Sequence, residues 1–154
     1  MTYDYSVENL WKVVSSPNYL NNVHPFCKEN SIIKWNNDHH EDKILYLNDK
    51  TYIRKFVSWR ALKGYDLWIG DNNKDQSFVE WRLEKVGNRS KLTITVYPFL
   101  LSNWPRVLSF LPYFLYINIK LKSYLFSVLS GIDWYIKENT PVPKNQFGKH
   151  SWFS

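Results

Sequence analysis

Cysteine, glycine and long runs of positive charge are scarce in this chain of 154 residues. The single cysteine, Cys27, cannot form a disulfide within the chain, which fits a reducing compartment. Only five glycines occur, and none of them forms a glycine-rich phosphate-binding loop. No run of Lys or Arg exceeds two residues, whereas nucleic-acid-binding proteins concentrate positive charge more strongly. These shortages argue against a disulfide scaffold, a phosphate loop and a nucleic-acid partner.

Long hydrophobic runs are also missing. The uncharged stretch Val107 to Ile119 has 13 residues, whereas a transmembrane helix needs about 20. The first residues, Met1 to Tyr5, lack the basic start and the apolar run of a secretory signal. We therefore predict no transmembrane helix and expect a cytoplasmic protein, at most peripheral to a membrane.

Aromatic residues are abundant instead, because eight Trp, eleven Tyr and nine Phe make up 18% of the chain. Aromatic rings are over-represented where proteins build apolar cavities or contact ligands. The net charge is +6, and residues 98–154 contribute +4 of it, from six basic and two acidic side chains. The length fits one domain. This composition favours binding over catalysis.

Two short helices are predicted near the N-terminus. Ser6 can cap a helix whose apolar positions recur at helical spacing as far as Val14. Ser16 followed by Pro17 repeats the start signal, which predicts a second short helix that ends before His24.

The chain then changes to the period of strands. Six segments are rich in β-branched and aromatic residues and are separated by short polar linkers, which predicts an antiparallel meander. In the last two, apolar and polar side chains alternate, so one face of the sheet is apolar and must be covered. The segments are Ser31 to Trp35, Lys43 to Leu47, Thr51 to Arg60, Tyr65 to Ile69, Ser77 to Glu84 and Lys91 to Tyr97.

A long C-terminal helix is predicted to supply the cover. From Phe114 to Lys137 the apolar residues fall on one helical stripe, and Pro141 marks the end. A helix of about 24 residues would extend for about 36 Å, enough to cross a sheet. We expect one α+β domain over residues 1–137, followed by a tail over residues 138–154.

The order of these elements resembles the helix-grip fold of the SRPBCC superfamily, which includes START-like lipid-transfer domains, ligand carriers similar to pollen allergens, and polyketide cyclases. The stretch Val7 to Pro17, followed by His24-Pro25, is similar to the opening of that family. The resemblance implies a curved antiparallel sheet of six or seven strands that wraps around the last helix, with an apolar cavity between them. The first strand of the family is normally longer than Tyr3 to Tyr5 allows here. Fold alone does not choose between carriers and cyclases.

Side chains on the concave face and in the short helices would line such a cavity. The aromatic candidates are Tyr46, Trp59, Trp81 and Tyr135. Each ring has an equally simple interpretation as part of a packed core, since apolar stripes usually form the core.

Polar candidates for this cavity are His24, Arg54 and Asp66. His24, at the exit of the second helix, can titrate near neutrality, or it can be a structural hydrogen-bonding group. Arg54 and Lys55 are neighbours on one strand, so one of them must face inward or lie at the rim. A buried arginine needs a carboxylate partner or an anionic ligand, and Asp66 or Glu80 could serve. The alternative is an ion pair on the convex, solvent-facing side.

No other pattern supports catalysis or a metal site. Asp38 to Asp42 contains metal-ligand residue types, but adjacent histidines on a loop diverge, so we interpret the segment as a solvated turn. Cys27 is interpreted as a small buried hydrophobic residue. No Ser/His/Asp or Cys/His arrangement with supporting spacing is visible. We predict no catalytic residue, no metal and no cofactor.

The segment Pro98 to Tyr113 connects the last strand to the long helix and is rich in aromatic and proline residues. If its rings are exposed, nearby basic residues would rim an apolar patch suited to an anionic membrane. It could equally fold inward as a lid or pack in a dimer. The candidate residues are Trp104, Arg106, Phe110 and Tyr113.

From the sequence we therefore expect a module that binds or transports a hydrophobic or amphipathic small molecule, similar to a lipid or an isoprenoid. The alternative is a small cyclase, dehydratase or hydrolase of the same fold, for which His24, Arg54 and Asp66 would have to converge on one wall. A third possibility is a partner-binding module without a ligand, which a filled cavity would indicate. The oligomeric state is left open.

Overall fold

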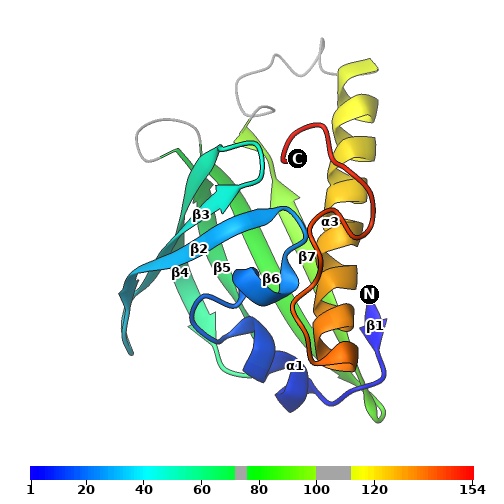
Figure 1. The fold of residues 1–154 in the computed structure, drawn as a ribbon. Helices are drawn as coiled ribbons and strands as arrows, with labels where there is room; N and C mark the ends of the chain where they lie inside the picture. Colours follow the sequence, from blue (N-terminus) through cyan, green and yellow to red (C-terminus); the bar gives the residue numbers. More distant parts are fainter. Residues whose placement is uncertain (72–75, 100–111) are drawn as a thin grey trace.

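A computed structural model describes residues 1–71, 76–99 and 112–154 (Figure 1). The elements follow the predicted order, with one further short strand at the start. They are β1 (Thr2–Tyr3), α1 (Val7–Val14), α2 (Leu20–Val23), β2 (Cys27–Trp35), β3 (His40–Tyr46), β4 (Thr51–Arg60), β5 (Gly64–Gly70), β6 (Gln76–Val86), β7 (Arg89–Tyr97) and α3 (Pro112–Glu138).

The strands form one antiparallel sheet in the order β1-β7-β6-β5-β4-β3-β2. Strands β2 to β7 form the predicted meander, and β1 joins the edge beside β7 through the pairs Thr2 with Lys91 and Tyr3 with Ser90. The 27 residues of α3 run along the sheet, and α1 and α2 close the remaining side (Figure 1). This arrangement confirms the helix-grip fold.

The apolar face of the sheet is the concave one, as the alternation predicted. In β6, Val79, Trp81 and Leu83 are buried, whereas the residues between them are only half-buried. In β5, Leu67 is fully buried while Trp68, the next residue, is 40% exposed. The core therefore lies between the concave face and α3, where burial of apolar area stabilises the fold.

The first helix forms as predicted, but the second starts later. Ser6 caps α1 by accepting a hydrogen bond from the backbone N–H of Asn9. The expected cap at Ser16 is wrong, because α2 begins at Leu20. Asn18 has a φ of 57°, which is left-handed and interrupts the helix that Pro17 would have begun.

Helices α2 and α3 approach so closely that only glycine fits between them. A Cβ atom on Gly131 would lie 2.1 Å from the backbone oxygen of Val23. The absence of a side chain at this position lets α2 rest directly on α3. This contact fixes the end of α2, where His24 follows.

The chain after α3 folds back along the same helix instead of leaving the domain (Figure 1). The backbone N–H of Val142 donates to the oxygen of Asn22 at 2.8 Å, and that of Asn145 donates to the oxygen of Pro25 at 3.0 Å. Further along, Asn48 donates through Nδ2 to the oxygen of Trp152 at 2.7 Å. The last residues are thereby held against α2 and the loop after β3.

In the described part of the chain, no helix combines the length and the apolarity that crossing a bilayer requires.

Candidate functional site

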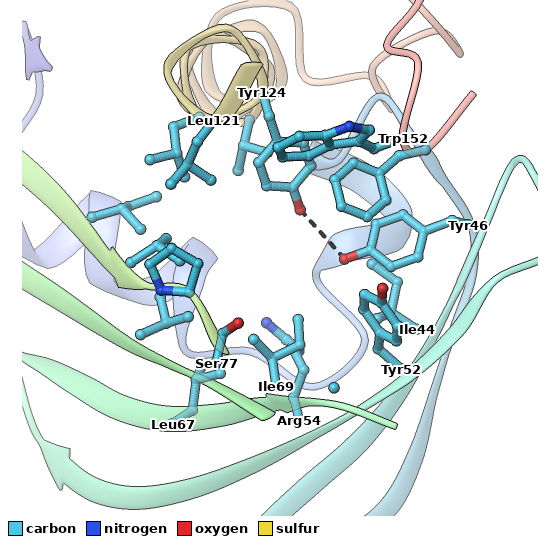
Figure 2. A pocket seen from close by; sticks show the side chains of 18 of the residues that line it. Ile44, Tyr46, Tyr52, Arg54, Leu67, Ile69, Ser77, Leu121, Tyr124 and Trp152 are labelled. Carbon is cyan, nitrogen blue, oxygen red and sulfur yellow. Dashed lines mark hydrogen bonds between the residues drawn. The ribbon is translucent and has the colours of Figure 1, made fainter. Parts of the chain in front are cut away.

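A cavity of about 410 Å³ lies between the sheet, α3 and the C-terminal segment (Figure 2). This volume falls within the range of small-molecule sites, which is roughly 300 to 1,000 Å³. Most of the lining is aliphatic or aromatic. The lining residues are Leu20, His24, Ile44, Tyr46, Lys50, Tyr52, Arg54, Leu67, Ile69, Gly70, Ser77, Val79, Trp81, Ile94, Val96, Pro98, Phe99, Leu121, Tyr124, Leu125, Val128, Trp152 and Phe153.

Local sequence fixes the position of His24. A residue before proline is pushed out of the helical region, and His24, before Pro25, is extended with a φ of −105° and a ψ of 109°, so α2 ends there. The adjoining strand is held by Asn21, which accepts from the backbone N–H of Asn30 at 2.7 Å. The imidazole is 2% exposed and points at Tyr124 on α3.

The protonation and tautomer of His24 follow from its contacts. Burial, with the nearby positive charges of Arg54 and Lys144, lowers the pKa of His24 to about 3, so the ring is neutral at physiological pH. The backbone N–H of Phe26 donates to Nδ1 at 3.2 Å. Nε2 must therefore carry the proton, and it donates to the hydroxyl oxygen of Tyr124 at 2.9 Å.

Two tyrosine hydroxyls meet at the wall of the cavity. The hydroxyls of Tyr46, on β3, and Tyr124, on α3, point toward one another at 3.4 Å (Figure 2). Burial raises the pKa of both phenols, so both keep their protons. Phe153 of the C-terminal segment packs against both rings, with centroids 4.4 Å from Tyr46 and 4.7 Å from Tyr124.

The floor of the cavity holds a buried ion pair. Arg54, on β4, faces Asp42, its register partner on β3, and its Nε donates to Oδ1 at 2.8 Å while Nη2 donates to Oδ2. Burial by itself lowers the pKa of Arg54, but the Asp42 carboxylate raises it well above its ordinary value. The guanidinium also lies 5.1 Å from the ring centre of Tyr19. The pair is compact and electrically neutral overall.

A chain of hydrogen bonds continues from this pair into the core. Nη1 of Arg54 donates to the hydroxyl of Tyr19 at 3.0 Å, and that hydroxyl lies 2.8 Å from the hydroxyl of Tyr65. Tyr65 in turn donates to the backbone oxygen of Val14 at 3.2 Å. Tyr19 is therefore the donor to Tyr65, and every hydroxyl proton in this chain has an acceptor.

Four of the seven residues expected to line a cavity do so, namely His24, Tyr46, Arg54 and Trp81. The structure places the other three elsewhere. Tyr135 lies on α3 three turns beyond Tyr124, past the end of the cavity. Trp59 stacks on His40 with ring centres 4.0 Å apart, in an aromatic cluster with Trp11 of α1.

Asp66 faces the convex side of the sheet, because its neighbours Tyr65 and Leu67 occupy the concave one. Its carboxylate pairs with Arg60 at 3.0 Å and also with Arg82. The partner of Arg54 is therefore Asp42 and neither Asp66 nor Glu80. The interpretation of residues 38–42 as a turn is wrong from His40 onward, where β3 begins.

Three further residues of the site carried no functional signal in the sequence. Tyr124 appeared only as one apolar position of the long helix, and Trp152 and Phe153 lie in the tail, which showed no periodicity. Among the membrane or lid candidates, Trp104, Arg106 and Phe110 lie outside the described residues, as does the side chain of Tyr113.

The described ranges contain no group of three or more His, Cys, Asp or Glu side chains placed to hold a metal ion. Cys27 is fully buried as a free thiol, and burial raises its pKa to about 11. It therefore packs as a small hydrophobic residue.

Comparison with known proteins finds similar folds among solved structures and no match in sequence. No family model matches the chain, and no curated protein matches it in sequence. Among solved structures, Ara h 8.0201 is 20% identical with a TM-score of 0.64, and the match covers 90% of this chain and 95% of that one. A START superfamily protein from Mycobacterium smegmatis is 11% identical with a TM-score of 0.59, covering 91% and 95%.

A third similar structure is the di-domain ARO/CYC StfQ from the steffimycin biosynthetic pathway, at 7% identity and a TM-score of 0.64. That match covers 90% of this chain and 44% of the longer StfQ chain. At these identities the likeness concerns the fold. It confirms the helix-grip fold that the sequence predicted.

Proposed function

We propose that the protein binds a hydrophobic or amphipathic small molecule, similar to a lipid or an isoprenoid, in the cavity between the sheet and α3. The observation that carries the proposal is the cavity itself, about 410 Å³ with a mainly apolar lining. Burying apolar ligand surface there contributes roughly 25 cal/mol per Å² before the costs of binding.

The buried polar groups His24 and Arg54 already have partners, which supports binding over catalysis. Arg54 is paired with Asp42, so it does not present an uncompensated charge. His24 is neutral and already hydrogen-bonded on both nitrogens. The enzymatic alternative required His24, Arg54 and Asp66 on one wall, and Asp66 faces the other side of the sheet. A histidine with a pKa of about 3 is also a poor general acid or base at neutral pH.

Binding can be tested with N-phenyl-1-naphthylamine, an uncharged probe that fluoresces in apolar surroundings. We expect saturable binding to the intact protein. Val96→Trp adds bulk inside the cavity and is expected to weaken binding about tenfold, or ~1.4 kcal/mol. Thr95→Trp places the same bulk on the opposite face of β7 and is the matched control.

Failure of the probe to bind saturably would contradict the proposal, and so would equal weakening by both variants. Native mass spectrometry of the protein from its own host, followed by denaturing extraction, would identify the natural ligand. A reproducible mass of a lipid or isoprenoid is the expected result.

Peripheral contact with an anionic membrane is a second proposal, supported by the outward side of α3. Leu115, Tyr116, Ile119 and Phe126 are between 51% and 65% exposed there. Lys120 lies over the ring of Tyr116 at 5.6 Å. Between residues 112 and 132 the chain contains two lysines and no acidic residue, a charge balance that suits an anionic surface.

Flotation with vesicles tests this contact. We expect the protein to float with phosphatidylserine-containing vesicles and less with neutral ones, and Ile119→Ser with Phe126→Ser to abolish flotation. Val57→Ser with Val86→Ser, which removes exposed apolar side chains from the sheet, is the control. Absence of binding by the parent protein would rule out the membrane contact.

A further inference from the structure

The cavity is bordered by two networks of hydrogen bonds, which differ in whether every hydroxyl proton has an acceptor. The network on the floor runs from Arg54 through Tyr19 and Tyr65 to the backbone oxygen of Val14, so each hydroxyl proton ends on an acceptor. The network on the wall runs from the backbone N–H of Phe26 through His24 to Tyr124. Among the residues that the structure describes, it reaches no carbonyl or carboxylate.

The wall network carries one hydroxyl proton too many. Because His24 donates to the oxygen of Tyr124, the proton of Tyr124 must point elsewhere, and its one neighbour among the described residues is the hydroxyl of Tyr46. If Tyr124 donates to Tyr46, the proton of Tyr46 has no acceptor. If Tyr46 donates to Tyr124, the proton of Tyr124 has none. Either way, one donor at the cavity wall lacks a protein acceptor in the part of the chain that is described.

The geometry of the pair adds to this imbalance. The two oxygens are 3.4 Å apart, longer than the 2.5 to 3.0 Å range of ordinary O–H···O bonds. Tyr46 is 1% exposed, so bulk solvent does not satisfy its hydroxyl. A buried donor without an acceptor is costly, and a group that supplies the acceptor therefore binds more tightly. Both hydroxyls border the cavity (Figure 2).

We infer that the ligand is uncharged and largely apolar and carries a hydrogen-bond-accepting oxygen, such as the carbonyl of a ketone, ester or quinone, which binds at the hydroxyls of Tyr46 and Tyr124. A carbonyl oxygen has two lone pairs and can accept from both. An uncharged ligand fits these hydroxyls because the buried Arg54 is already neutralised by Asp42 and His24 carries no charge; Lys50, the other basic side chain of the described lining, is exposed to solvent. This inference rests on the proposed function and specifies the ligand class.

The test uses two probes of nearly the same shape, 2-acetylnaphthalene and 2-ethylnaphthalene, which differ in the carbonyl. Dissociation constants are measured by competition with N-phenyl-1-naphthylamine. The hydrocarbon leaves water more readily, so the diagnostic quantity is the ratio of the two constants and its change between variants. We expect Tyr46→Phe and Tyr124→Phe each to weaken the ketone about three- to tenfold and to leave the hydrocarbon nearly unchanged.

Tyr46→Phe is the decisive variant, because it removes one phenol donor and leaves the hydrogen bond from His24 to Tyr124 in place, whereas Tyr124→Phe also frees the Nε2–H of His24, which lines the same cavity. The carbonyl stretching band of bound 2-acetylnaphthalene should lie at lower frequency in the parent protein and shift toward its apolar-solvent position in Tyr46→Phe. Tyr52→Phe is the matched control, since Tyr52 lines the same cavity.

An unchanged ratio in Tyr46→Phe, or an equal change in Tyr52→Phe, would overturn the inference while the cavity still binds both probes. Absence of binding by either naphthalene and by N-phenyl-1-naphthylamine would overturn the proposed function as well. Thermal unfolding of each variant shows whether a loss of binding reflects a loss of fold.

Discussion

The ion pair beneath the cavity makes a quantitative prediction about stability. Asp42 is fully buried, and Arg54 is 3% exposed. Their contact consists of two hydrogen bonds that join both carboxylate oxygens to the guanidinium. Arg54→Met leaves the carboxylate without a partner, whereas Asp42→Leu leaves the guanidinium without one. Removing one member of such a pair costs roughly 3–5 kcal/mol of folding free energy.

The double variant is expected to differ from the sum of the single ones. With both charges replaced by apolar side chains of similar total volume, neither desolvation penalty persists, and such replacements are often neutral or stabilising. The hydroxyl of Tyr19 loses a donor but still donates to Tyr65, so it is not stranded. We expect the double variant to lie within about 2 kcal/mol of the parent and the coupling energy to be at least about 4 kcal/mol.

The free energy of unfolding of the parent, the two single variants and the double variant is measured by urea unfolding followed by tryptophan fluorescence. The dependence of this free energy on urea concentration should be the same in all four proteins. For a chain of 154 residues, a loss of 4 kcal/mol corresponds to a decrease in Tm of roughly 8 to 16 °C. Arg60→Met with Asp66→Leu, on the convex face, is the control and should show much weaker coupling, because Arg60 is partly exposed and Asp66 also pairs with Arg82. Additive losses for Asp42 and Arg54 would refute the buried-pair reasoning.

Two more predictions follow from α2 and its end. Burial lowers the pKa of His24 from 6.5 to about 3, so the unfolded chain binds the proton more tightly and stability falls as pH drops below 6.5, by roughly 2 kcal/mol at pH 5. Denaturant titrations at both pH values should show that His24→Asn loses less unfolding free energy on acidification than the parent, whereas the exposed His39→Gln loses as much as the parent. A loss in His24→Asn equal to that of the parent would contradict the lowered pKa of His24. Gly131→Ala gains about 1 kcal/mol of helix propensity, yet its Cβ would lie 2.1 Å from the Val23 oxygen, so we expect net destabilisation by about 1–3 kcal/mol, unlike Ser130→Ala.

The fold could be predicted because its signals are local. The alternation in β6 and β7, the cap at Ser6 and the long apolar stripe of α3 each act over a few residues and agree with one another. The errors lie where two local signals compete. Pro17 after Ser16 is a valid helix start, but the left-handed Asn18 intervenes, and the polar run from Asp38 to Asp42 conceals the first residues of β3.

The site was harder to predict because its residues meet through the sheet register and the last helix. Asp42 and Arg54 are partners only once β3 and β4 pair in register. Alternation along β3 places Asp42 on the concave side, together with Ile44 and Tyr46, and all three are buried. The predicted strand began at Lys43 and so left Asp42 out of this pattern. His24 and Tyr124 are 100 residues apart, and no local pattern relates them.

The C-terminal segment shows why the aromatic content alone did not locate the ligand site. The aromatic rings form two groups. One is a cluster around Trp59 that packs against α1, and the other is the cavity wall, where Phe153 packs on Tyr46 and Tyr124. The first group fills space and stabilises the fold. In the second, the rings bring two hydroxyls together beside the cavity. Hydrogen bonds distinguish the two groups, because the hydroxyl of Tyr65, whose ring stacks on Trp59, donates to a backbone oxygen, whereas the described wall network leaves one hydroxyl proton without an acceptor.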